Sequence, residues 1–420
     1  MSKPVTLAVL GAGARGRGYA TYAEKNPDKL KIVAVADPDP VWRKRFAERY
    51  DLPADRCFES WEDFCAQPKM CDGVIIATQD NMHEGPAVAC ANLKYHILLE
   101  KPMAPTPEAC RNIVAAVKAN NVMFGVCHVL RYTKYTRALK EILDSGEIGE
   151  IVSVQHLEPV GYWHQAHSFV RGHWRNEKES SFMLLAKSCH DVDWLHYVIG
   201  KKCTDIQSFG SLRHFKKSEQ PEGAADRCID CPREIESLCP YSAYKIYFRD
   251  RFAAGRLLWP TDVLTAGPVT KEKLAEALKN GQYGRCVYAC DNDVVDNQTV
   301  NMLFEDGSTA VMTMTAFNNH SGRKTRIFGT LGEIEGDSQL ITIRKFINNS
   351  TRTVDTNIVN DGGILSGHGG GDFGLMESFV EALATGDQNK ILSGIDETLA
   401  SHLMVFAAEE SRRKSQVVKM

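Results

Sequence analysis

The sequence predicts an α/β chain with two domains: an N-terminal domain built on a parallel sheet, and a C-terminal α+β domain with a largely antiparallel sheet. A chain of 420 residues is too long for one ordinary core. In its first third, short buried-type strands alternate with helical segments, which is typical of a parallel sheet. From about Ile151 the strands alternate apolar and polar residues and are joined by turn residues, which is typical of antiparallel pairing.

The first element is the segment around which the N-terminal domain is organised. A β-branched apolar run over residues 5–10 meets a glycine-rich turn, which opens a helical segment. In such a unit Gly11 permits the turn, Gly13 lets the backbone approach a pyrophosphate, and Gly16 lets the helix pack closely on the strand. The helix start offers its free amides to the anion. The pattern predicts a Rossmann dinucleotide-binding domain.

A second strand, at 31–37, ends in an acidic residue. Asp37 lies at about the distance after the glycines that is expected for the carboxylate that accepts the adenosine ribose hydroxyls. Pro38 follows it and no basic residue is adjacent, so a 2′-phosphate would be repelled. The sequence therefore favours NAD over NADP.

The remaining N-terminal elements continue the alternation. A helical segment is expected at 41–50, and buried strands at 73–78, 95–100 and 122–126. Thr106 caps a helix whose apolar residues repeat at helical spacing through Val117. These elements predict a first domain over residues 1–130 and a second over 131–420, with a shared helix near the junction.

The second domain is expected to be a sheet with helices on one face. The predicted elements are strands at 151–157, 298–304, 309–316, 326–330, 332–336 and 340–346, and helices at 372–385 and 397–414. A polar stretch at about 213–283 has weak periodicity and is predicted to be an insertion.

Composition excludes several classes of protein. Lys and Arg number 50 against 53 Asp and Glu, a net charge of -3 without a long basic run, so nucleic acid is not expected as a partner. No cleavage-site pattern and no run of eighteen apolar residues is found, so we expect a cytoplasmic protein without a membrane partner. The thirteen cysteines are read mostly as reduced core thiols.

Two segments carry candidate catalytic groups. Lys101, in Glu100-Lys101-Pro102, ends a central strand, where open α/β sheets place ligands, and its charge would favour an alkoxide. His190 lies in the first turn of a predicted helix, and a histidine can take a hydroxyl proton while hydride leaves carbon. A helix-capping or partly buried structural histidine is the alternative.

The motifs together resemble the Gfo/Idh/MocA family, named after glucose-fructose oxidoreductase and inositol dehydrogenase. The resemblance covers most of the chain except about 213–283 and is specific as an ordered set. The motifs are GAGARG with Asp37, IATQDNMH at 76–83, EKP at 100–102, His190 with Asp193, GTLGEIEG at 329–336, and GHGGGD at 367–372.

The resemblance implies a role for each matching position. Lys101 would reach the substrate oxygen, and His190 would be the catalytic histidine. His128 would lie beside the nicotinamide, and Trp174-Arg175 would reach back from the second domain to the cofactor. The other positions implied to bind the cofactor are Gly11, Gly13, Arg15 and Gly16 at the pyrophosphate, Asp37 at the adenosine ribose, Thr78, Asn81 and His83 along the groove, and Glu100 near the nicotinamide ribose.

One departure from the family pattern concerns the reaction. Family dehydrogenases usually carry an Asp four residues before the catalytic histidine, where this chain has Ala186 followed by Lys187. Either Asp191, Asp193 or Lys187 then tunes His190, or the reaction is not a plain alcohol oxidation.

An aromatic and histidine-rich loop precedes Trp174. Flat aromatic rings stack on sugars, and histidines bind hydroxyls and carboxylates. His164 and His167 are also spaced as a possible metal pair, although such pairs in loops are usually polar contacts. The substrate-facing candidates are Tyr162, Trp163, His164, His167, His173 and, from the late glycine-rich motif, His368.

A cysteine group lies in the insertion. Cys228, Cys231 and Cys239 have metal-like spacing, and a structural zinc would substitute for a core there. An iron-sulfur cluster and three reduced thiols are the alternatives, because a complete four-ligand motif is absent. The candidate fourth ligands are Cys203, His214, Cys286 and Cys290.

The sequence and the resemblance together predict an NAD-dependent oxidoreductase. It would transfer a hydride between nicotinamide and a ring hydroxyl of a sugar, sugar acid or cyclitol, with Lys101 and His190 as the main catalytic residues and Lys187 and Asp191 as candidates. The alternatives are an NAD-dependent redox-neutral glycosidase and an NAD-binding regulatory protein. A homo-oligomer is expected from the resemblance.

Overall fold

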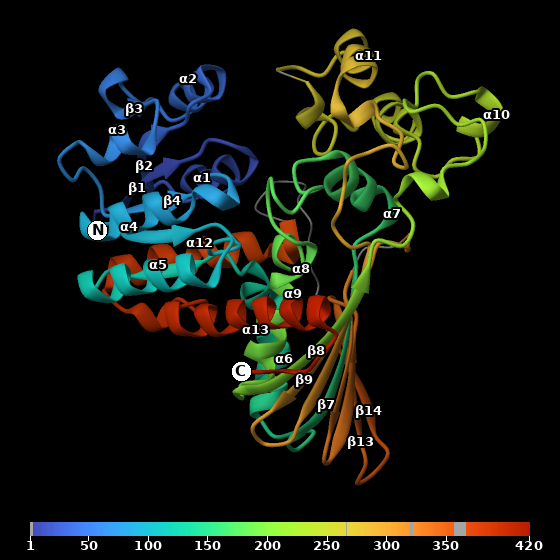
Figure 1. The fold of residues 1–420 in the computed structure, drawn as a ribbon. Helices are drawn as coiled ribbons and strands as arrows, with labels where there is room; N and C mark the ends of the chain where they lie inside the picture. Colours follow the sequence, from blue (N-terminus) through green and yellow to red (C-terminus); the bar gives the residue numbers. More distant parts are fainter. Residues whose placement is uncertain (1–2, 266, 320–321, 357–366) are drawn as a thin grey trace.

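The computed structural model describes residues 3–265, 267–319, 322–356 and 367–420. The predicted N-terminal and C-terminal sheets are both present (Figure 1). The first sheet has six parallel strands in the order β3-β2-β1-β4-β5-β6. Because the order reverses direction at β1, a crevice forms beyond the carboxyl ends of β1 and β4, where such sheets bind ligands. The strands are β1 (Val5–Leu10), β2 (Leu30–Ala36), β3 (Cys57–Phe58), β4 (Gly73–Ile76), β5 (His96–Leu99) and β6 (Phe124–Val126).

Helices connect these strands and cover both faces of the sheet. The strands are buried almost throughout, as expected for a parallel sheet with helices on both sides. The helix that begins after Thr106 does so as predicted, because the Thr106 side chain accepts the amide of Ala109. The helices are α1 (Ala14–Lys25), α2 (Pro40–Arg49), α3 (Trp61–Cys65), α4 (Glu84–Asn92) and α5 (Pro107–Asn120).

The second sheet has nine strands in the order β14-β13-β12-β11-β7-β10-β9-β8-β15. Its pairs are antiparallel apart from β7 with β10, which confirms the largely antiparallel sheet. The strands are β7 (Ile151–Pro159), β8 (Cys203–Ser211), β9 (Asn297–Phe304), β10 (Thr309–Thr315), β11 (Lys324–Gly329), β12 (Gly332–Gly336), β13 (Leu340–Lys345), β14 (Thr351–Asp355) and β15 (Val418–Lys419).

Helices cover one face of this sheet and leave the other open (Figure 1). Alternate residues along β9 and β10 are buried, so each strand turns one side to the helices. The helices of this half are α6 (Lys134–Asp144), α7 (Tyr162–His164), α8 (Met183–Ala186), α9 (Cys189–Ile199), α10 (Arg233–Glu236), α11 (Lys271–Asn280), α12 (Gly367–Thr385) and α13 (Ile395–Lys414).

The last long helices return to the N-terminal half. Leu375, Met376 and Phe379 of α12 are buried in one core cluster with residues of β1 and α1. Val126 of β6 donates its amide to Ser393 O just before α13. The core of the N-terminal half therefore includes residues from the end of the chain, which lie beyond the predicted domain boundary at residue 130.

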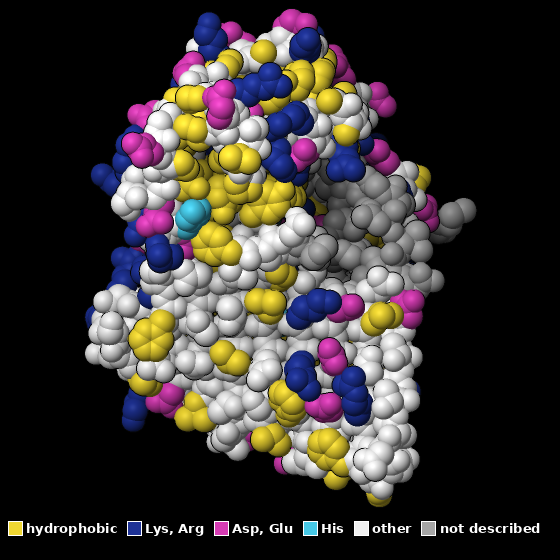
Figure 2. Space-filling view, turned by 90° about the vertical axis from the view of Figure 1, so that its right-hand side faces the viewer, with side chains coloured by type: hydrophobic (Ala, Val, Ile, Leu, Met, Phe, Trp, Pro, Cys, Tyr) yellow, Lys and Arg dark blue, Asp and Glu magenta, His cyan; other side chains and the backbone are white. Residues whose placement is uncertain are grey.

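Residues 212–296, between β8 and β9, form the insertion. It lies above the end of the large sheet, against α7 (Figure 1). Its buried apolar side chains, among them Phe215, Tyr247 and Leu274, make a separate small core with Ala166 and Val170. In Figure 2 hydrophobic side chains gather around a hollow at this level of the molecule.

One helical stretch is long and apolar enough to cross a membrane by length and composition. It covers Gln388–Lys414, and half of it is buried inside the fold. Since α13 packs against α9, α5 and β8, its apolar residues are those of a core helix, and the stretch is weak evidence for a membrane span.

Candidate active site

The glycine-rich turn has the backbone that a dinucleotide needs. Gly11 adopts φ +99°, and a Cβ there would lie 2.5 Å from Ala77 O on the neighbouring strand connection. A Cβ on Gly16 would lie 2.0 Å from Gly11 O, so helix α1 and strand β1 approach closely only because both residues are glycine. A Cβ on Gly13 would meet nothing within 4 Å, which leaves open space over the start of α1. The turn therefore fits a pyrophosphate.

Asp37 lies beside this turn at the end of β2. One carboxylate oxygen accepts the Ala12 amide at 2.6 Å, and the other accepts the Asp39 amide at 2.8 Å. The fold also brings basic side chains near: Arg43 donates to Asp37 O at 2.6 Å, and Arg17 donates to Ala12 O at 2.9 Å. The sequence showed no basic neighbour of Asp37, because Arg17 and Arg43 come from helices α1 and α2.

The Arg15 side chain is paired with two carboxylates of the protein, and its role at a pyrophosphate stays a prediction. Its Nε donates to Glu100 at 2.7 Å, and Nη2 donates to Asp372 of the late glycine-rich motif. Glu100 also accepts the Tyr19 hydroxyl and the Lys101 amide, both at 2.7 Å. The Arg15 guanidinium holds the pKa of the buried Glu100 carboxyl below its usual value, against the burial that would raise it. Arg15 and Glu100 thus tie the glycine-rich turn to the turn that carries Lys101.

The segment after β4 supplies a contact between the two halves of the chain. Asp80 accepts the Trp174 indole N–H at 3.3 Å, so Trp174 reaches back to the first half of the chain. Thr78 is half-buried and Asn81 exposed, on the same short segment. His83 differs from the expectation: its ring is fully buried, within hydrogen-bond distance of Pro102 O at 2.8 Å and Thr78 O at 3.2 Å. It holds the turn after Lys101 and does not line an open groove.

Lys101 meets the second half of the chain. Its Nζ donates to Ala186 O at 2.8 Å, four residues before His190. Ala186 ends the short helix α8, and His190 lies in the first turn of α9. The missing carboxylate is therefore replaced by a neutral backbone carbonyl.

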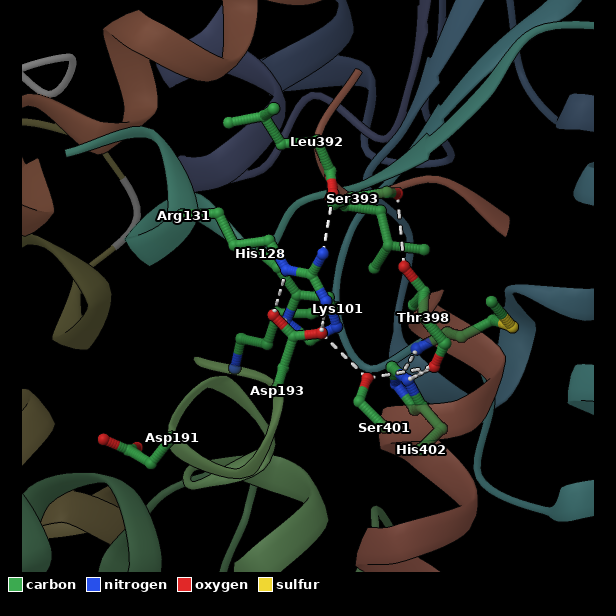
Figure 3. A network of polar contacts seen from close by, with 12 residues as sticks. Lys101, His128, Arg131, Asp191, Asp193, Leu392, Ser393, Thr398, Ser401 and His402 are labelled. Atoms are coloured by element: carbon green, nitrogen blue, oxygen red, sulfur yellow. Dashed lines mark hydrogen bonds and ion pairs between the residues drawn. The ribbon is translucent and has the colours of Figure 1, made fainter. Parts of the chain in front are cut away.

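His128 lies between three other polar side chains. Its ring is edge-on to His190 at a centroid distance of 5.7 Å and lies 5.3 Å from His402, and its Nδ1 is 3.6 Å from an oxygen of Asp193. Figure 3 shows Lys101 beside His128 and Asp193. Neither ring nitrogen of His128 has a hydrogen-bond partner within the part of the chain that the structure describes.

A buried ion pair lies behind these histidines (Figure 3). Arg131 donates to both oxygens of Asp193 at 2.8 and 2.7 Å, and Ser401 donates to one of them at 2.8 Å. The His402 ring accepts the Met103 amide at 2.8 Å and lies 2.9 Å from Thr398 O, which fixes it as a neutral ring with the proton on Nδ1. The network fastens α9, and with it His190, to α13 and to the turn that follows Lys101.

His128 and His402 stay neutral near pH 7. Burial lowers the pKa of His128 to about 3, although Asp193 opposes the shift. Burial also lowers the pKa of His402 to about 4. The pKa of the Asp193 carboxyl falls to about 2, since the charge of Arg131 outweighs burial. Asp193, one of the three alternatives that the sequence left open, thus lies as a carboxylate 3.6 Å from His128 Nδ1, and its action on His190 stays a prediction.

Asp191 points the other way (Figure 3). Its carboxylate accepts Arg323 Nε at 2.5 Å and His156 Nε2 at 3.0 Å. Lys187 Nζ lies 3.1 Å from Glu158, and Arg323 bridges to the same Glu158 at 2.9 Å. Asp191 and Lys187 are thus both paired with groups of β7 and of the residue before β11, and their action on His190 stays a prediction.

Comparison with known proteins decides the family. A family model described as "Oxidoreductase family, NAD-binding Rossmann fold" matches residues 5–128, and one described as "Oxidoreductase family, C-terminal alpha/beta domain" matches residues 140–420.

The chain belongs to the Gfo/Idh/MocA oxidoreductase family. The predicted resemblance and the fold class are thereby confirmed, and the match to an NAD-binding Rossmann fold supports the predicted NAD site.

Relatives within the Gfo/Idh/MocA family are distant. The chain is 27% identical to 2,7-anhydro-N-acetylneuraminate hydratase of Escherichia coli over 211 residues, 50% of this chain and 54% of that protein. It is 27% identical to inositol 2-dehydrogenase of Corynebacterium glutamicum over 209 residues, 49% of this chain and 58% of that protein. The chain thus spans little more than half the length of these relatives. A solved structure of levoglucosan dehydrogenase with NADH has the same fold, with a TM-score of 0.71 and 18% identity over 99% of both chains.

The histidine-rich loop is packed against the insertion. His167 is buried, its ring stacks on Tyr283 at 4.9 Å, its Nδ1 lies 2.7 Å from the Tyr247 hydroxyl, and burial lowers its pKa to about 3. It supports the loop and does not face an open site. The rings of His164 and Trp163 contact that of Trp259 in the insertion, with centroid distances of 5.1 and 5.5 Å.

The other loop candidates have varied surroundings. Tyr162 is partly exposed and accepts a hydrogen bond from Lys245 at 3.2 Å, and His173 is exposed. Arg175 forms ion pairs with Asp291 and Glu179, so its charge is neutralised by residues of the second half of the chain. His368 lies in the first turn of α12, but its side chain lies outside the described residues.

The expected zinc at Cys228, Cys231 and Cys239 is not supported. Among the described residues no group of three His, Cys, Asp or Glu side chains is placed to hold a metal ion. The Cys228 thiol is instead satisfied by the protein, since its Sγ lies 3.3 Å from the Ala243 amide, 3.5 Å from Arg171 and 3.8 Å from Arg285 O. The same finding gives no support, within the described chain, to a metal site at His164 and His167.

Several site residues escaped sequence reasoning. Arg131, His402 and Ser401 surround Asp193, and Glu158 and Arg323 surround Lys187. A charged residue between the apolar Leu157 and Pro159, at the end of a strand, is the signal that could have identified Glu158. Arg323 and His402 gave no local signal.

Proposed function

We propose that this member of the Gfo/Idh/MocA family transfers a hydride between bound NAD and a ring carbinol carbon of a sugar, sugar acid or cyclitol. The observation that carries the proposal is the contact of Lys101 Nζ with Ala186 O, because it joins the strand-end amine of the NAD-binding half to the segment that leads into His190. An amine and an imidazole from the two halves can then act on one small molecule.

The residues present fit a dinucleotide. Gly13 leaves space at the helix start, Asp37 stands at the end of β2, and the unpaired nitrogens of buried His128 need a partner that a ligand would supply. NAD, when bound, accepts the hydride from the substrate carbon or returns it.

The protein's own groups handle the oxygen and its proton. Lys101 donates to the substrate oxygen, and its charge remains effective because its present partner is a neutral carbonyl. His190 takes the hydroxyl proton as the carbon is oxidised and returns it in the reverse direction. His128, with a pKa of about 3, is neutral at pH 7 and therefore positions groups through hydrogen bonds and does not store a proton.

A redox-neutral reaction on a glycoside is the second candidate. Ala186 stands where the dehydrogenases of the family usually carry the carboxylate next to the lysine, and one relative carries the name of an anhydrosugar hydratase. In that reaction the sugar is oxidised only transiently, its aglycone is eliminated, water adds and the sugar is reduced again.

One assay distinguishes these reactions. A dehydrogenase given excess NAD and a panel of free sugars, sugar acids and cyclitols should accumulate NADH in proportion to the substrate consumed. A redox-neutral glycosidase given chromogenic glycosides should release the aglycone without net NADH, and borohydride reduction of its bound NAD should abolish the release. Binding of NAD with neither signal would favour the regulatory alternative and refute both enzyme proposals.

The small-molecule substrate, the cytoplasmic location and the homo-oligomer remain predictions. The open face of the large sheet carries a hollow of about 680 Å³ between β7, β10, β11 and β13, and we expect a second copy of the chain to cover this face. Sedimentation of the purified protein would test this expectation.

A further inference from the structure

A group of charged side chains lies next to the proposed reaction site. Lys187 follows Ala186, whose carbonyl binds Lys101, and its Nζ is 3.1 Å from Glu158. Arg323 lies 2.9 Å from the other oxygen of Glu158 and 2.5 Å from Asp191. We call Lys187, Glu158, Arg323 and Asp191 the charged cluster.

The cluster belongs to one end of the large sheet. Glu158 is near the end of β7, and Arg323 immediately precedes β11, which pairs with β7 with Lys324 opposite Leu157. His156 and Thr325 hydrogen-bond to each other on the helix-covered face, and Arg323 and Glu158 are two residues from them and share that face. Helix α9 supplies Asp191 from the same side, one residue after His190.

The carboxylates of the cluster are buried and its cations reach the surface. The Glu158 and Asp191 side chains are 4% and 0% exposed, whereas those of Lys187 and Arg323 are 19% and 18% exposed. The Nη1 nitrogen of Arg323 has no hydrogen-bond partner among the described residues. An approaching small molecule would therefore meet hydrogen-bond donors.

The cations of this region differ in their partners. Lys187 and Arg323 are paired with the buried carboxylates of Glu158 and Asp191. Lys101 Nζ is bound to the carbonyl oxygen of Ala186, and the nearby Glu100 carboxylate is itself paired with Arg15.

Because the cations of the charged cluster are partly exposed while its carboxylates are buried, we propose that the substrate presents a carboxylate to them, so that the enzyme acts on a carboxylated sugar, with Arg323 and Lys187 as the residues that select the carboxylate. This inference rests on the proposed function and narrows its substrate class. Guanidinium nitrogens match the geometry of a carboxylate, and a charge-assisted hydrogen bond in a partly buried site is stronger than a neutral one.

The test compares ligands that differ only in the carboxylate. The protein is loaded with NAD, and binding of glucuronate against glucose, galacturonate against galactose and mannuronate against mannose is measured by calorimetry. At least one uronate should bind about ten to one hundred times more tightly than its neutral partner. If no uronate binds more tightly than its neutral partner, the inference is wrong.

Variants assign the effect to residues. Arg323→Gln should remove most of the preference for the uronate over its neutral partner. Because Arg323→Gln leaves Asp191 with only His156, Lys187→Met serves as a second variant that removes one exposed cation and a single ion pair. Arg326→Gln is the matched control, since Arg326 lies on the open face of β11, the strand that Arg323 precedes, and pairs with Glu333. The assignment of the carboxylate site to Arg323 and Lys187 would be overturned by either of two results. One is an equal loss of the uronate preference in Arg326→Gln, and the other is an unchanged uronate preference in both Arg323→Gln and Lys187→Met.

The failure of this inference can be told apart from failure of the proposed function. Turnover of neutral sugars without a preference for uronates would keep the oxidoreductase and exclude the carboxylate site. Tight uronate binding that depends on Arg323, without any turnover, would keep the carboxylate site and exclude the proposed reaction.

Discussion

The buried pair of Arg131 and Asp193 offers the strongest test of how the site is held. Both side chains are 1% exposed, and Asp193 accepts two hydrogen bonds from Arg131 and one from Ser401. Asp193→Ala removes all three bonds and leaves a buried guanidinium without its counter-charge. Breaking a buried pair from one side costs about 3–5 kcal/mol, so we expect the free energy of unfolding to fall by about that amount.

The double variant separates the pair from its surroundings. Arg131→Met with Asp193→Leu leaves neither charge behind, and apolar replacement of a buried pair is often close to neutral, so it should recover about 2 kcal/mol or more relative to Asp193→Ala. Urea unfolding of the wild type, Arg131→Met, Asp193→Leu and the double variant measures the four free energies of the cycle, with the slope checked for equality.

Two results would refute this reasoning. A loss below about 1 kcal/mol in Asp193→Ala would mean that the pair is not buried as described. A double variant as unstable as the sum of the single variants would mean that the pair carries no coupling. Asp193→Asn, which keeps the shape and removes the charge, should fall between the wild type and Asp193→Ala.

Three further predictions follow from the same geometry. Lys101→Met should lower turnover by about a hundredfold or more while NAD affinity changes little, because the donor to the substrate oxygen is lost; turnover equal to wild type would remove Lys101 from the mechanism. Asp37→Ala should weaken NAD and narrow its preference over NADP, measured as the ratio of the two dissociation constants; an unchanged ratio would show that the ribose lies elsewhere. The free energy of unfolding should fall as the pH drops below about 6.5. At about pH 5 each of His128, His167 and His402 should have lowered it by about 2 kcal/mol. Above pH 6.5 these three residues should not change it.

The sign of the pH effect follows from where the proton binds. Burial lowers the pKa of each of these histidines in the folded chain to about 3 or 4, while the unfolded chain takes up protons near its ordinary pKa of 6.5. Acid therefore favours the unfolded chain between pH 6.5 and the folded pKa. His402→Gln should reduce the steepness of the loss, and the same steepness in wild type and variant would contradict the buried, neutral state of His402.

The local motifs of the first half could be predicted from sequence because their physics is local. Gly11, Gly13 and Gly16 act through the backbone of one turn, and a Cβ at Gly11 or Gly16 would meet atoms of that turn or of the adjoining strand connection. Asp37 and Lys101 follow from the ends of strands, since parallel strands place their carboxyl ends at one edge.

The pairing of the charged groups could not be predicted in this way. Asp191 and Asp193 are two residues apart on α9, yet one binds Arg323 and the other Arg131, from opposite sides of the helix. The residues next to Asp191 and Asp193 in the sequence do not indicate which of the two binds which arginine. The partners come from segments 132 and 62 residues away, and their choice depends on how α9 lies between the sheet and the first domain.

By itself the sequence determined the two kinds of sheet, the dinucleotide turn and the family, because these depend on residue spacing within short segments, but it did not reveal the strands β8 and β14. Only the tertiary structure decided that His83 and His167 are buried supports, that Arg15 binds Glu100 and Asp372, and that Cys228 is satisfied without a metal. The physical reason is that burial and charge pairing are set by segments that meet only after folding, and no local pattern specifies which distant group will be the partner.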